Sequence, residues 1–245
     1  MSGKILPLSE SVRSKLRSGI TITSVAQCVE EMVLNSIDAN ATCIAIRIDP
    51  TIFRIQVVDN GDGVTEENLK LLGKRHATSK CHSLEDLNSN LGHYGFRGEA
   101  LASLVEVAAM WTSPHDTGNS ANTDQDFAYG KEKSISVAKV PRPSIGTTIT
   151  VQDFMYNMPV RRKLMKEAID IENIRVRLES FALIKISLSL RNDIGQSKVM
   201  HTNKSNSTLS TFMQLFGLEK SQGLVEVEHI VDQFTVTGYI SVQPH

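Results

Sequence analysis

The chain has 245 residues, 40% of them hydrophobic and 22% charged, which is typical of a globular protein with one domain and part of a second. Its 26 lysines and arginines are balanced by 27 acidic residues, so bulk charge gives no argument for nucleic acid, membrane or acidic substrates, and any DNA contact needs a local patch. The absence of a long apolar stretch or a signal-like start, together with three widely spaced cysteines, predicts an intracellular protein without disulfides.

The first predicted element is an amphipathic helix over residues 25–39. Ser24 and Gln27 have the spacing of a capping box, which marks a helix start. Apolar residues then recur with helical period from Val25 to Ile37, so one face of this helix is expected to pack on a core.

The opposite face of this helix carries a polar stripe. The 100° step per residue brings Glu31, Asn35 and Asp38 together, whereas Glu30 falls at the border of the two faces. A stripe of this kind can be a solvated surface, and by itself that is the more common explanation.

Two alternating segments follow, Cys43–Ile48 and Phe53–Val58, and they predict an antiparallel pair of strands. The second strand runs into Asp59-Asn60-Gly61-Asp62-Gly63, where glycines permit close approach of a ligand to the backbone. A simple turn is the plain alternative. A calcium loop is disfavoured because the required glutamate ligand is missing.

A long functional loop is predicted over residues 73–97, after a short helix over Thr65–Leu72. It leads into a helix predicted over Glu99–Met110, and the glycines before that helix suggest a phosphate cradle of backbone N–H groups. A zinc site is disfavoured because the nearby cysteine and histidines match no common zinc spacing; these residues are Cys81, His82 and His93. Trp111 is expected in the core.

The second half of the chain predicts mixed elements, with a polar surface loop first. The expected segments are the loop Ser113–Lys133, strands Ser134–Val140 and Thr147–Phe154, helix Val160–Ile184 and strand Ser187–Leu190. A linker over residues 202–208 precedes a helix, Leu209–Phe216, and two strands, Leu224–Ile230 and Phe234–Ile240, which are too few to bury a core alone. We therefore expect one domain over residues 1–203 and the incomplete start of a second over 204–245.

Taken together, the motifs resemble the signature of the MutL family of DNA mismatch-repair proteins, within the GHKL superfamily of ATPases. Each motif is weak alone, but their common order is specific. In chain order they are Glu31-x-x-x-Asn35, Asn35-Ser36-Ile37-Asp38-Ala39, Asp59-x-Gly61-x-Gly63, Arg75-His76-Ala77-Thr78-Ser79-Lys80, Gly95-Phe96-Arg97-Gly98-Glu99-Ala100-Leu101, Gly146-Thr147-Thr148 and Tyr156-Asn157-Met158-Pro159-Val160-Arg161-Arg162-Lys163. The resemblance covers nearly the whole chain and is greatest to the third eukaryotic MutL homologue. Leu34 stands where many MutL proteins carry a second glutamate.

The resemblance implies the GHKL, or Bergerat, fold. That fold is an α/β two-layer sandwich with a mixed sheet, followed here by the truncated start of a second α+β domain like domain 2 of ribosomal protein S5.

The resemblance also implies an ATP site with Mg²⁺. Glu31 would be the catalytic base, Asn35 the magnesium ligand and Asp59 the acceptor for the adenine amino group. Thr148 would support Asp59 and adenine through water. The other nucleotide-binding residues that the resemblance implies are Asp38, Gly61, Gly63, Thr78, Ser79, Lys80, Gly95, Phe96, Arg97, Gly98, Glu99 and Ala100.

The implied function is slow ATP hydrolysis in mismatch repair and meiotic recombination in the nucleus. ATP would order the loop as a lid and close a clamp on double-stranded DNA with another MutL homologue as partner, away from any membrane. A basic cluster could touch DNA phosphates, although ion pairs or a solvated helix start explain it better; its members are Arg161, Arg162, Lys163 and Lys166. A hydrolytically idle clamp subunit remains an alternative. A topoisomerase or kinase is disfavoured by the motif combination.

Overall fold

An eight-stranded mixed sheet forms the main body of the chain in this computed structural model. In sheet order its strands are β5 (Lys131–Val137), β4 (Thr123–Ala128), β3 (Ala109–His115), β6 (Gly146–Gln152), β2 (Arg54–Asp59), β1 (Cys43–Asp49), β7 (Ser187–Asn192) and β8 (Ser197–Thr202). Neighbouring strands are antiparallel except β1 and β7, which are parallel. The structure describes residues 7, 9, 12–13, 17–18, 21–75, 77, 93–95, 99–115, 123–138, 142, 144–167, 171–184, 186–232 and 234–242, without the side chains of residues 166, 167 and 195.

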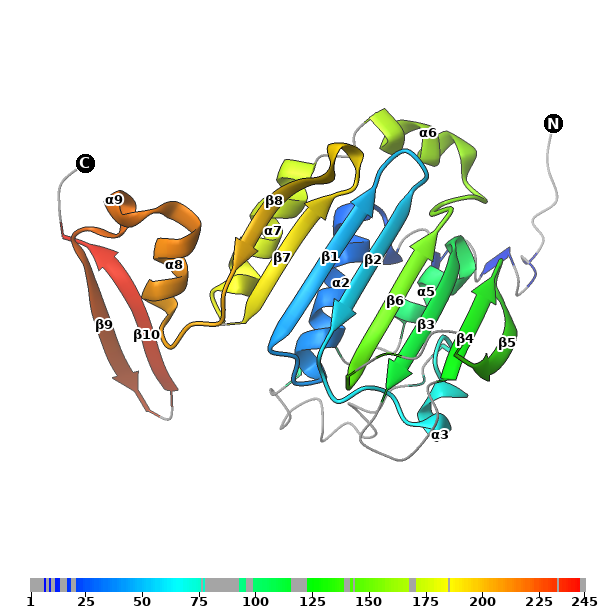
Figure 1. Ribbon diagram of the computed structural model, residues 1–245, viewed down its shortest axis with the longest axis horizontal. Coiled ribbons are helices and arrows are strands. Elements are labelled where there is room, and N and C mark those ends of the chain that lie inside the picture. Colours follow the sequence, from blue (N-terminus) through cyan, green and yellow to red (C-terminus); the bar gives the residue numbers. More distant parts are fainter. Residues whose placement is uncertain are drawn as a thin grey trace.

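Three helices cover one face of this sheet (Figure 1): α2 (Val25–Asp38), α5 (Ala100–Val107) and α7 (Ile171–Ala182). The strands alternate accordingly, as in β1, where Ile44, Ile46 and Ile48 are buried against the helices. Burying each such side chain contributes roughly 1.5–3 kcal/mol, so this face holds the core. The expected two-layer α/β sandwich with a mixed sheet is confirmed.

The predicted first helix and the two strands after it are confirmed closely. Ser24 caps α2, its hydroxyl accepting from the Gln27 N–H at 3.1 Å, and β1 and β2 pair antiparallel. The shorter α3 (Glu66–Leu69) replaces the helix expected over Thr65–Leu72.

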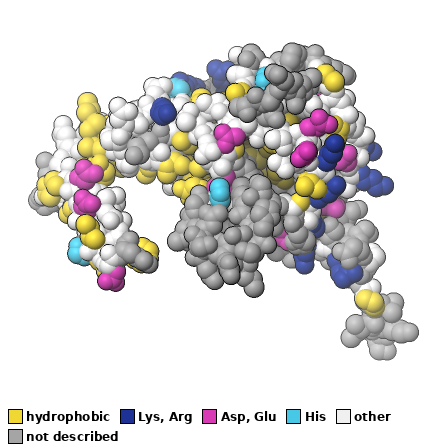
Figure 2. Space-filling view, turned by 90° about the horizontal axis from the view of Figure 1, so that it is seen from below, with side chains coloured by type: hydrophobic (Ala, Val, Ile, Leu, Met, Phe, Trp, Pro, Cys, Tyr) yellow, Lys and Arg dark blue, Asp and Glu magenta, His cyan; other side chains and the backbone are white. Residues whose placement is uncertain are grey.

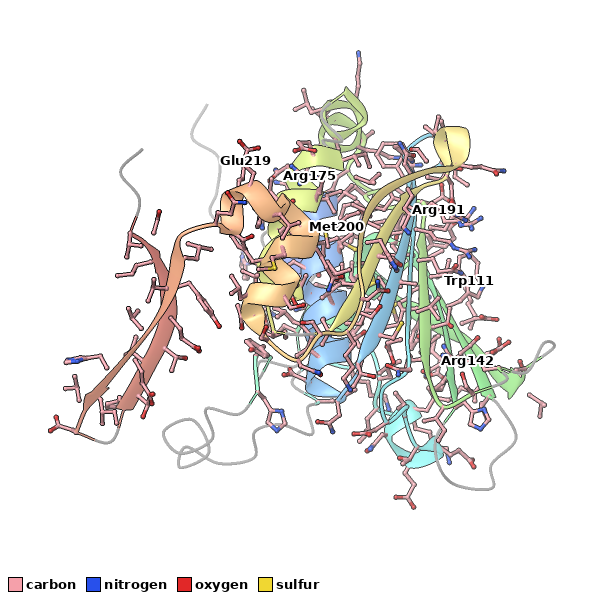
Figure 3. All side chains as sticks on the ribbon, turned by 60° about the vertical axis from the view of Figure 1, so that its left-hand side comes forward. Trp111, Arg142, Arg175, Arg191, Met200 and Glu219 are labelled. Carbon is pink, nitrogen blue, oxygen red and sulfur yellow. The ribbon has the colours of Figure 1, made fainter. Side chains whose placement is uncertain are left out.

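The opposite face of the sheet carries no helix among the described elements, and Trp111 lies on it. Met110 and Thr112 in β3 are fully buried, whereas Trp111 between them is 38% exposed and points away from the helices (Figure 3). The expectation of a core tryptophan is wrong because β3 places its successive side chains on opposite faces. The helix predicted over Glu99–Met110 also ends earlier, at Val107.

The polar surface loop expected over Ser113–Lys133 is wrong. Except for residues 116–122, which are not described, it belongs to β3, β4 and β5, and Tyr129 and Gly130 form the β4–β5 turn with positive φ values of 59° and 80°. Strand β5 confirms the strand predicted over Ser134–Val140 with earlier bounds, Lys131–Val137, and all of its residues are exposed at the edge of the sheet.

Two more expectations needed correction. The single helix Val160–Ile184 is found as α6 (Pro159–Glu167) and α7, and they differ in burial: Val160 in α6 is exposed, whereas α7 buries Leu178. Strand β8 was missed because its residues next to β7 are largely polar.

The last elements follow β8 in the chain (Figure 1): α8 (Thr208–Phe216), α9 (Leu218–Ser221), β9 (Leu224–Val231) and β10 (Phe234–Ser241). The predicted helix and two strands are confirmed, and the two strands pair as an antiparallel hairpin separate from the large sheet. Within the described ranges, no helix has the length and apolar character to cross a bilayer.

Candidate nucleotide site

The site begins with the polar face of α2. Its apolar residues, among them Met32 and Val33, pack into the core, so Glu31 and Asn35 remain half-exposed on the other side. The two residues are one helical turn apart and therefore share this face.

Of the two adjacent glutamates, Glu30 is engaged elsewhere. Its carboxylate forms an ion pair with Arg177 of α7. Burial and, to a lesser degree, the Glu31 carboxylate raise the pKa of the Cys28 thiol. The structure thus separates a glutamate that ties α2 to α7 from one that lies beside Asn35.

Asp59 is buried at the end of β2 with its carboxylate already oriented. Oδ1 accepts hydrogen bonds from the backbone N–H groups of Gly61 at 2.9 Å and Thr147 at 3.0 Å. Oδ2 accepts from the Ser36 hydroxyl at 2.9 Å. A carboxylate has about four acceptor positions, so Oδ2 retains capacity for one more donor, such as the exocyclic amino group of a base.

Two glycines let the backbone approach this carboxylate closely. A Cβ on Gly61 would lie 2.5 Å from the Ala39 carbonyl oxygen at the end of α2, and a Cβ on Gly146 would lie 2.1 Å from the Asp59 carbonyl oxygen. The loop is also tied to α2 by the Asp62 N–H, which donates to the Ala39 carbonyl at 2.8 Å. Gly63 follows with a positive φ of 79°.

The structure places Thr147, and not Thr148, beside Asp59. Thr147 is buried on the helix-covered side together with Ile149 and Val151, and its N–H binds the carboxylate. Thr148 has the opposite orientation, and its hydroxyl accepts a hydrogen bond from Arg142. The alternation of Ile149 and Val151 was a signal in the sequence that could have identified Thr147.

Asp38 positions the backbone of the following loop. Its side chain is 1% exposed, and its two oxygens accept hydrogen bonds from the N–H groups of Tyr94 at 2.8 Å and Gly95 at 2.9 Å. The His93 ring lies 3.9 Å away. The carboxylate that was predicted to contact nucleotide thus contacts the backbone of the glycine segment.

Glu99 and Ala100 lie at the amino end of α5, where Glu99 is the N-cap residue and also lies 3.8 Å from Arg17. Several residues predicted for the site lie outside the described part of the chain: Thr78, Ser79, Lys80, Phe96, Arg97 and Gly98, as do Cys81 and His82.

The described residues fit a hard cation that takes most of its oxygen ligands from phosphate groups and water and few from the protein. No group of three or more histidine, cysteine, aspartate or glutamate side chains in these residues could hold a metal ion. Mg²⁺ usually takes one or two protein oxygens together with phosphates and water. The half-exposed Asn35 amide can supply such an oxygen.

The basic cluster at the start of α6 is partly used within the protein. Arg162 donates to Asp153 at 3.1 Å and stacks over the Phe53 ring at 4.7 Å. Lys163 is exposed, and the Lys166 side chain lies outside the described residues. These contacts support the ion-pair explanation for Arg162.

Comparison with known proteins identifies the family of this chain. Residues 22–155 match the family described as histidine kinase-, DNA gyrase B-, and HSP90-like ATPase. The chain is 44% identical over 241 residues, 97% of its length, to human DNA mismatch repair protein Mlh3, and 31% identical over 98% of its length to MutL of Bacillus cereus. It spans 16% and 37% of those two relatives.

Solved structures show the same fold. A structure described as the N-terminal domain of a DNA repair protein has a TM-score of 0.77 and 27% identity, covering 96% of this chain and 74% of that one. The Aquifex aeolicus MutL ATPase domain complexed with ADP has a TM-score of 0.68 and 21% identity, covering 91% of this chain and 79% of that one. The chain therefore belongs to the family of histidine kinase-, DNA gyrase B- and HSP90-like ATPases and, within it, to the MutL-type mismatch-repair proteins.

Proposed function

We propose that this chain binds ATP with Mg²⁺ and hydrolyses it slowly, with adenine on Asp59 and the phosphates near Asn35 and Glu31. The observation that carries this proposal is the Ser36 hydroxyl, which joins α2 to the Asp59 carboxylate at 2.9 Å. Because Ser36 follows Asn35 directly, the base-binding carboxylate and the polar face of α2 are held in one rigid arrangement.

Each residue then has a defined chemical task. The free acceptor position of Asp59 takes the adenine amino group, which guanine lacks at that position. Glu31 orients or deprotonates the attacking water. Mg²⁺, held by Asn35 and phosphate oxygens, would neutralise charge on the phosphates. Asp38 binds the Gly95 N–H and so fixes the start of the glycine segment. The backbone N–H groups that follow Gly95 in the sequence would then bind the phosphates.

The test is ATP turnover together with nucleotide affinity. Glu31→Ala should keep ATP affinity within several-fold and lose about 10²- to 10⁴-fold in hydrolysis, because Glu31 acts on water. Glu30→Gln is the matched control and should retain turnover, since Glu30 pairs with Arg177. Asn35→Ala should weaken the magnesium-dependent part of binding. Equal turnover of wild type and Glu31→Ala would reject the role of Glu31, and wild-type binding without turnover would favour the idle clamp subunit.

We propose further that residues 204–245 begin a second domain of a longer protein. One face of the β9–β10 hairpin is apolar by its pairing register and exposed, with Phe234 at 60% and Val236 at 63% (Figure 2). An exposed apolar face of this kind marks an interaction surface. The rest of that domain would cover it, and the relatives are several times longer than this chain.

The names of the relatives support a role in DNA mismatch repair. We propose a role in meiotic recombination beside it, as the motif resemblance implies. ATP binding would order the lid and close two such chains, this one and another MutL homologue, as a clamp on DNA in the nucleus. Segment ordering by a terminal phosphate is a known physical route to such a change.

For double-stranded DNA we propose contact through the helix-free face of the sheet. Arg47 of β1 lies opposite Arg191 of β7, which lies opposite Lys198 of β8. All three are exposed, and none has an acidic partner within the described ranges. Like charges directly opposite each other in a sheet are destabilising. A polyanion would relieve this repulsion.

This contact can be tested by the salt dependence of DNA binding. Neutralising Arg47, Arg191 and Lys198 with glutamine should weaken binding and reduce the slope of log K against log salt by about one per lost phosphate contact. A variant at Arg161 and Lys163 serves as the comparison. A slope that changes only in the comparison variant would assign DNA to α6 instead.

A further inference from the structure

Arg142 bridges two strand ends directly behind the proposed base-binding carboxylate. Its Nη2 donates a hydrogen bond to the Asp59 carbonyl oxygen at 2.7 Å, and its Nη1 donates to the Thr148 hydroxyl. One guanidinium therefore links the end of β2 to the beginning of β6. Figure 3 shows Arg142 on the side of the sheet that faces away from the helices, so it approaches the site from behind.

Both atoms that Arg142 contacts lie in residues that position the Asp59 carboxylate or are adjacent to such a residue. The Asp59 carbonyl is in the same residue as the carboxylate, and Thr148 is next to Thr147, whose N–H donates to Oδ1 at 3.0 Å. Gly146 packs against the same carbonyl, since a Cβ there would come within 2.1 Å of it. The carbonyl oxygen is thus held between a glycine and a cation, which fixes the backbone of Asp59.

The electrostatics around Arg142 agree with this contact. Burial lowers the pKa of the guanidinium, and the nearby Asp59 carboxylate acts in the opposite direction and raises it. Moving a cation out of water is costly unless it is paired and hydrogen-bonded. Here the two acceptors and the carboxylate provide that compensation, and hydrogen bonds to a charged group are roughly twice as strong as neutral ones.

We infer that Arg142 is a positioning residue for base recognition, which holds Asp59 and the Thr147–Thr148 step so that the carboxylate presents its remaining acceptor position to the adenine amino group. This inference rests on the proposed function. It assigns part of the adenine preference to a residue outside all the motifs, in a segment where the sequence gives no periodic signal.

A residue that merely stabilised the fold would affect every nucleotide equally, so the test compares two ligands. ATP and purine riboside triphosphate differ by the exocyclic amino group that Asp59 would accept. Wild type should prefer ATP by about tenfold or more, the value of a hydrogen bond to a charged group. In Arg142→Ala this preference should fall to about two- to threefold, as expected for a misplaced acceptor. Affinities are measured by calorimetry, with thermal unfolding recorded for each variant.

Three further variants keep the test decisive. Arg142→Lys retains the charge but has a single donor nitrogen in place of two, so it should restore part of the preference, whereas Arg142→Gln should not. Arg54→Ala is the matched control, because Arg54 lies at the other end of β2 and pairs with Asp193 at 3.7 Å. It should retain the wild-type preference. If Arg142→Ala does not fold, Arg142→Gln provides the same comparison.

The outcomes separate this inference from the proposed function. If wild type binds both nucleotides equally, the contact between Asp59 and the amino group is wrong. If wild type prefers ATP and Arg142→Gln shows the same preference, the role of Arg142 is overturned while the ATP site stands. A loss of preference in Arg54→Ala as large as in Arg142→Gln would show a general effect on β2 and would also overturn it.

Discussion

At the scale of single residues, the site depends on contacts that leave no room for other side chains. Asp59 has three donors around its carboxylate, from Gly61, Thr147 and Ser36. Two of these come from backbone N–H groups, so the carboxylate can be held only where the chain approaches it very closely. The position of the carboxylate therefore depends on the close approach at Gly61 and Gly146 as well as on the Ser36 hydroxyl.

Gly61→Ala should disrupt this approach. The added Cβ would meet the Ala39 carbonyl oxygen at 2.5 Å, and because that atom is backbone, the end of α2 or the loop must move. We expect a loss of stability of about 1–3 kcal/mol and weaker ATP binding. Gly238→Ala is the control, since no atom lies within 4 Å of its added Cβ. Chemical denaturation gives the free energy of unfolding of each variant. Equal values for Gly61→Ala and Gly238→Ala would contradict the close contact.

The two described cysteines should differ sharply in reactivity. Cys28 is fully buried on the core-facing side of α2, and burial together with Glu31 raises its thiol pKa, which leaves little of the reactive thiolate. Cys43 is exposed. Iodoacetamide should therefore label Cys43 in the folded protein and label Cys28 only after unfolding, as read by tandem mass spectrometry. Fast labelling of Cys28 in a folded Cys43→Ser variant would show that α2 opens readily.

At the scale of secondary structure elements, sequence patterns succeeded where one face is buried. The helix over Val25–Asp38 and the strands β1 and β2 follow the periods that their core residues impose. Strand β5 overlaps the strand predicted over Ser134–Val140. Strands β4 and β8 were missed because polar strands need only the hydrogen-bond ladder of a neighbour, which the sequence does not display.

The candidate site was predictable to the same extent. Local spacing placed Glu31 and Asn35 on one helical face and Asp59 at a strand end, as the structure has them. The choice between Thr147 and Thr148 depended on strand orientation, and the contacts of Asp38 and Arg142 join segments far apart in the chain. Such long-range partners are set by tertiary packing, so no local pattern contains them.

The cap of α2 is an element whose contribution can be measured. The Ser24 hydroxyl accepts from the Gln27 N–H, and the Gln27 side chain accepts in return from the Thr23 N–H at 3.1 Å. Ser24→Ala should cost about 1 kcal/mol and lower the melting temperature by about 2–4 °C, while Ser24→Gly should cost less. Calorimetry provides the values, and no change in Ser24→Ala would mean that packing alone defines the start of this helix.

At the scale of the whole molecule, the described elements form one buried core and one hairpin whose apolar face is exposed. The eight-stranded sheet buries its apolar side chains beneath α2, α5 and α7. The β9–β10 hairpin instead exposes its apolar face, and its strands pair with each other without joining the large sheet. Helix α8 lies between the two, because Leu215 packs against the main core and the Thr208 hydroxyl donates to the Leu183 carbonyl at 3.4 Å.

This arrangement predicts different results for two truncations. A chain of residues 1–222 lacks only the hairpin and should keep its melting temperature within a few degrees and its nucleotide affinity unchanged. It should also lose binding of a hydrophobic dye, because the exposed apolar face is removed. A chain of residues 1–203 also lacks α8 and should melt lower, since it loses the packing of Leu215, which is partly buried against the main core. If the 1–222 chain instead lost its cooperative unfolding or its affinity for ATP, the hairpin would be part of the first core, and the boundary proposed near residue 203 would be wrong.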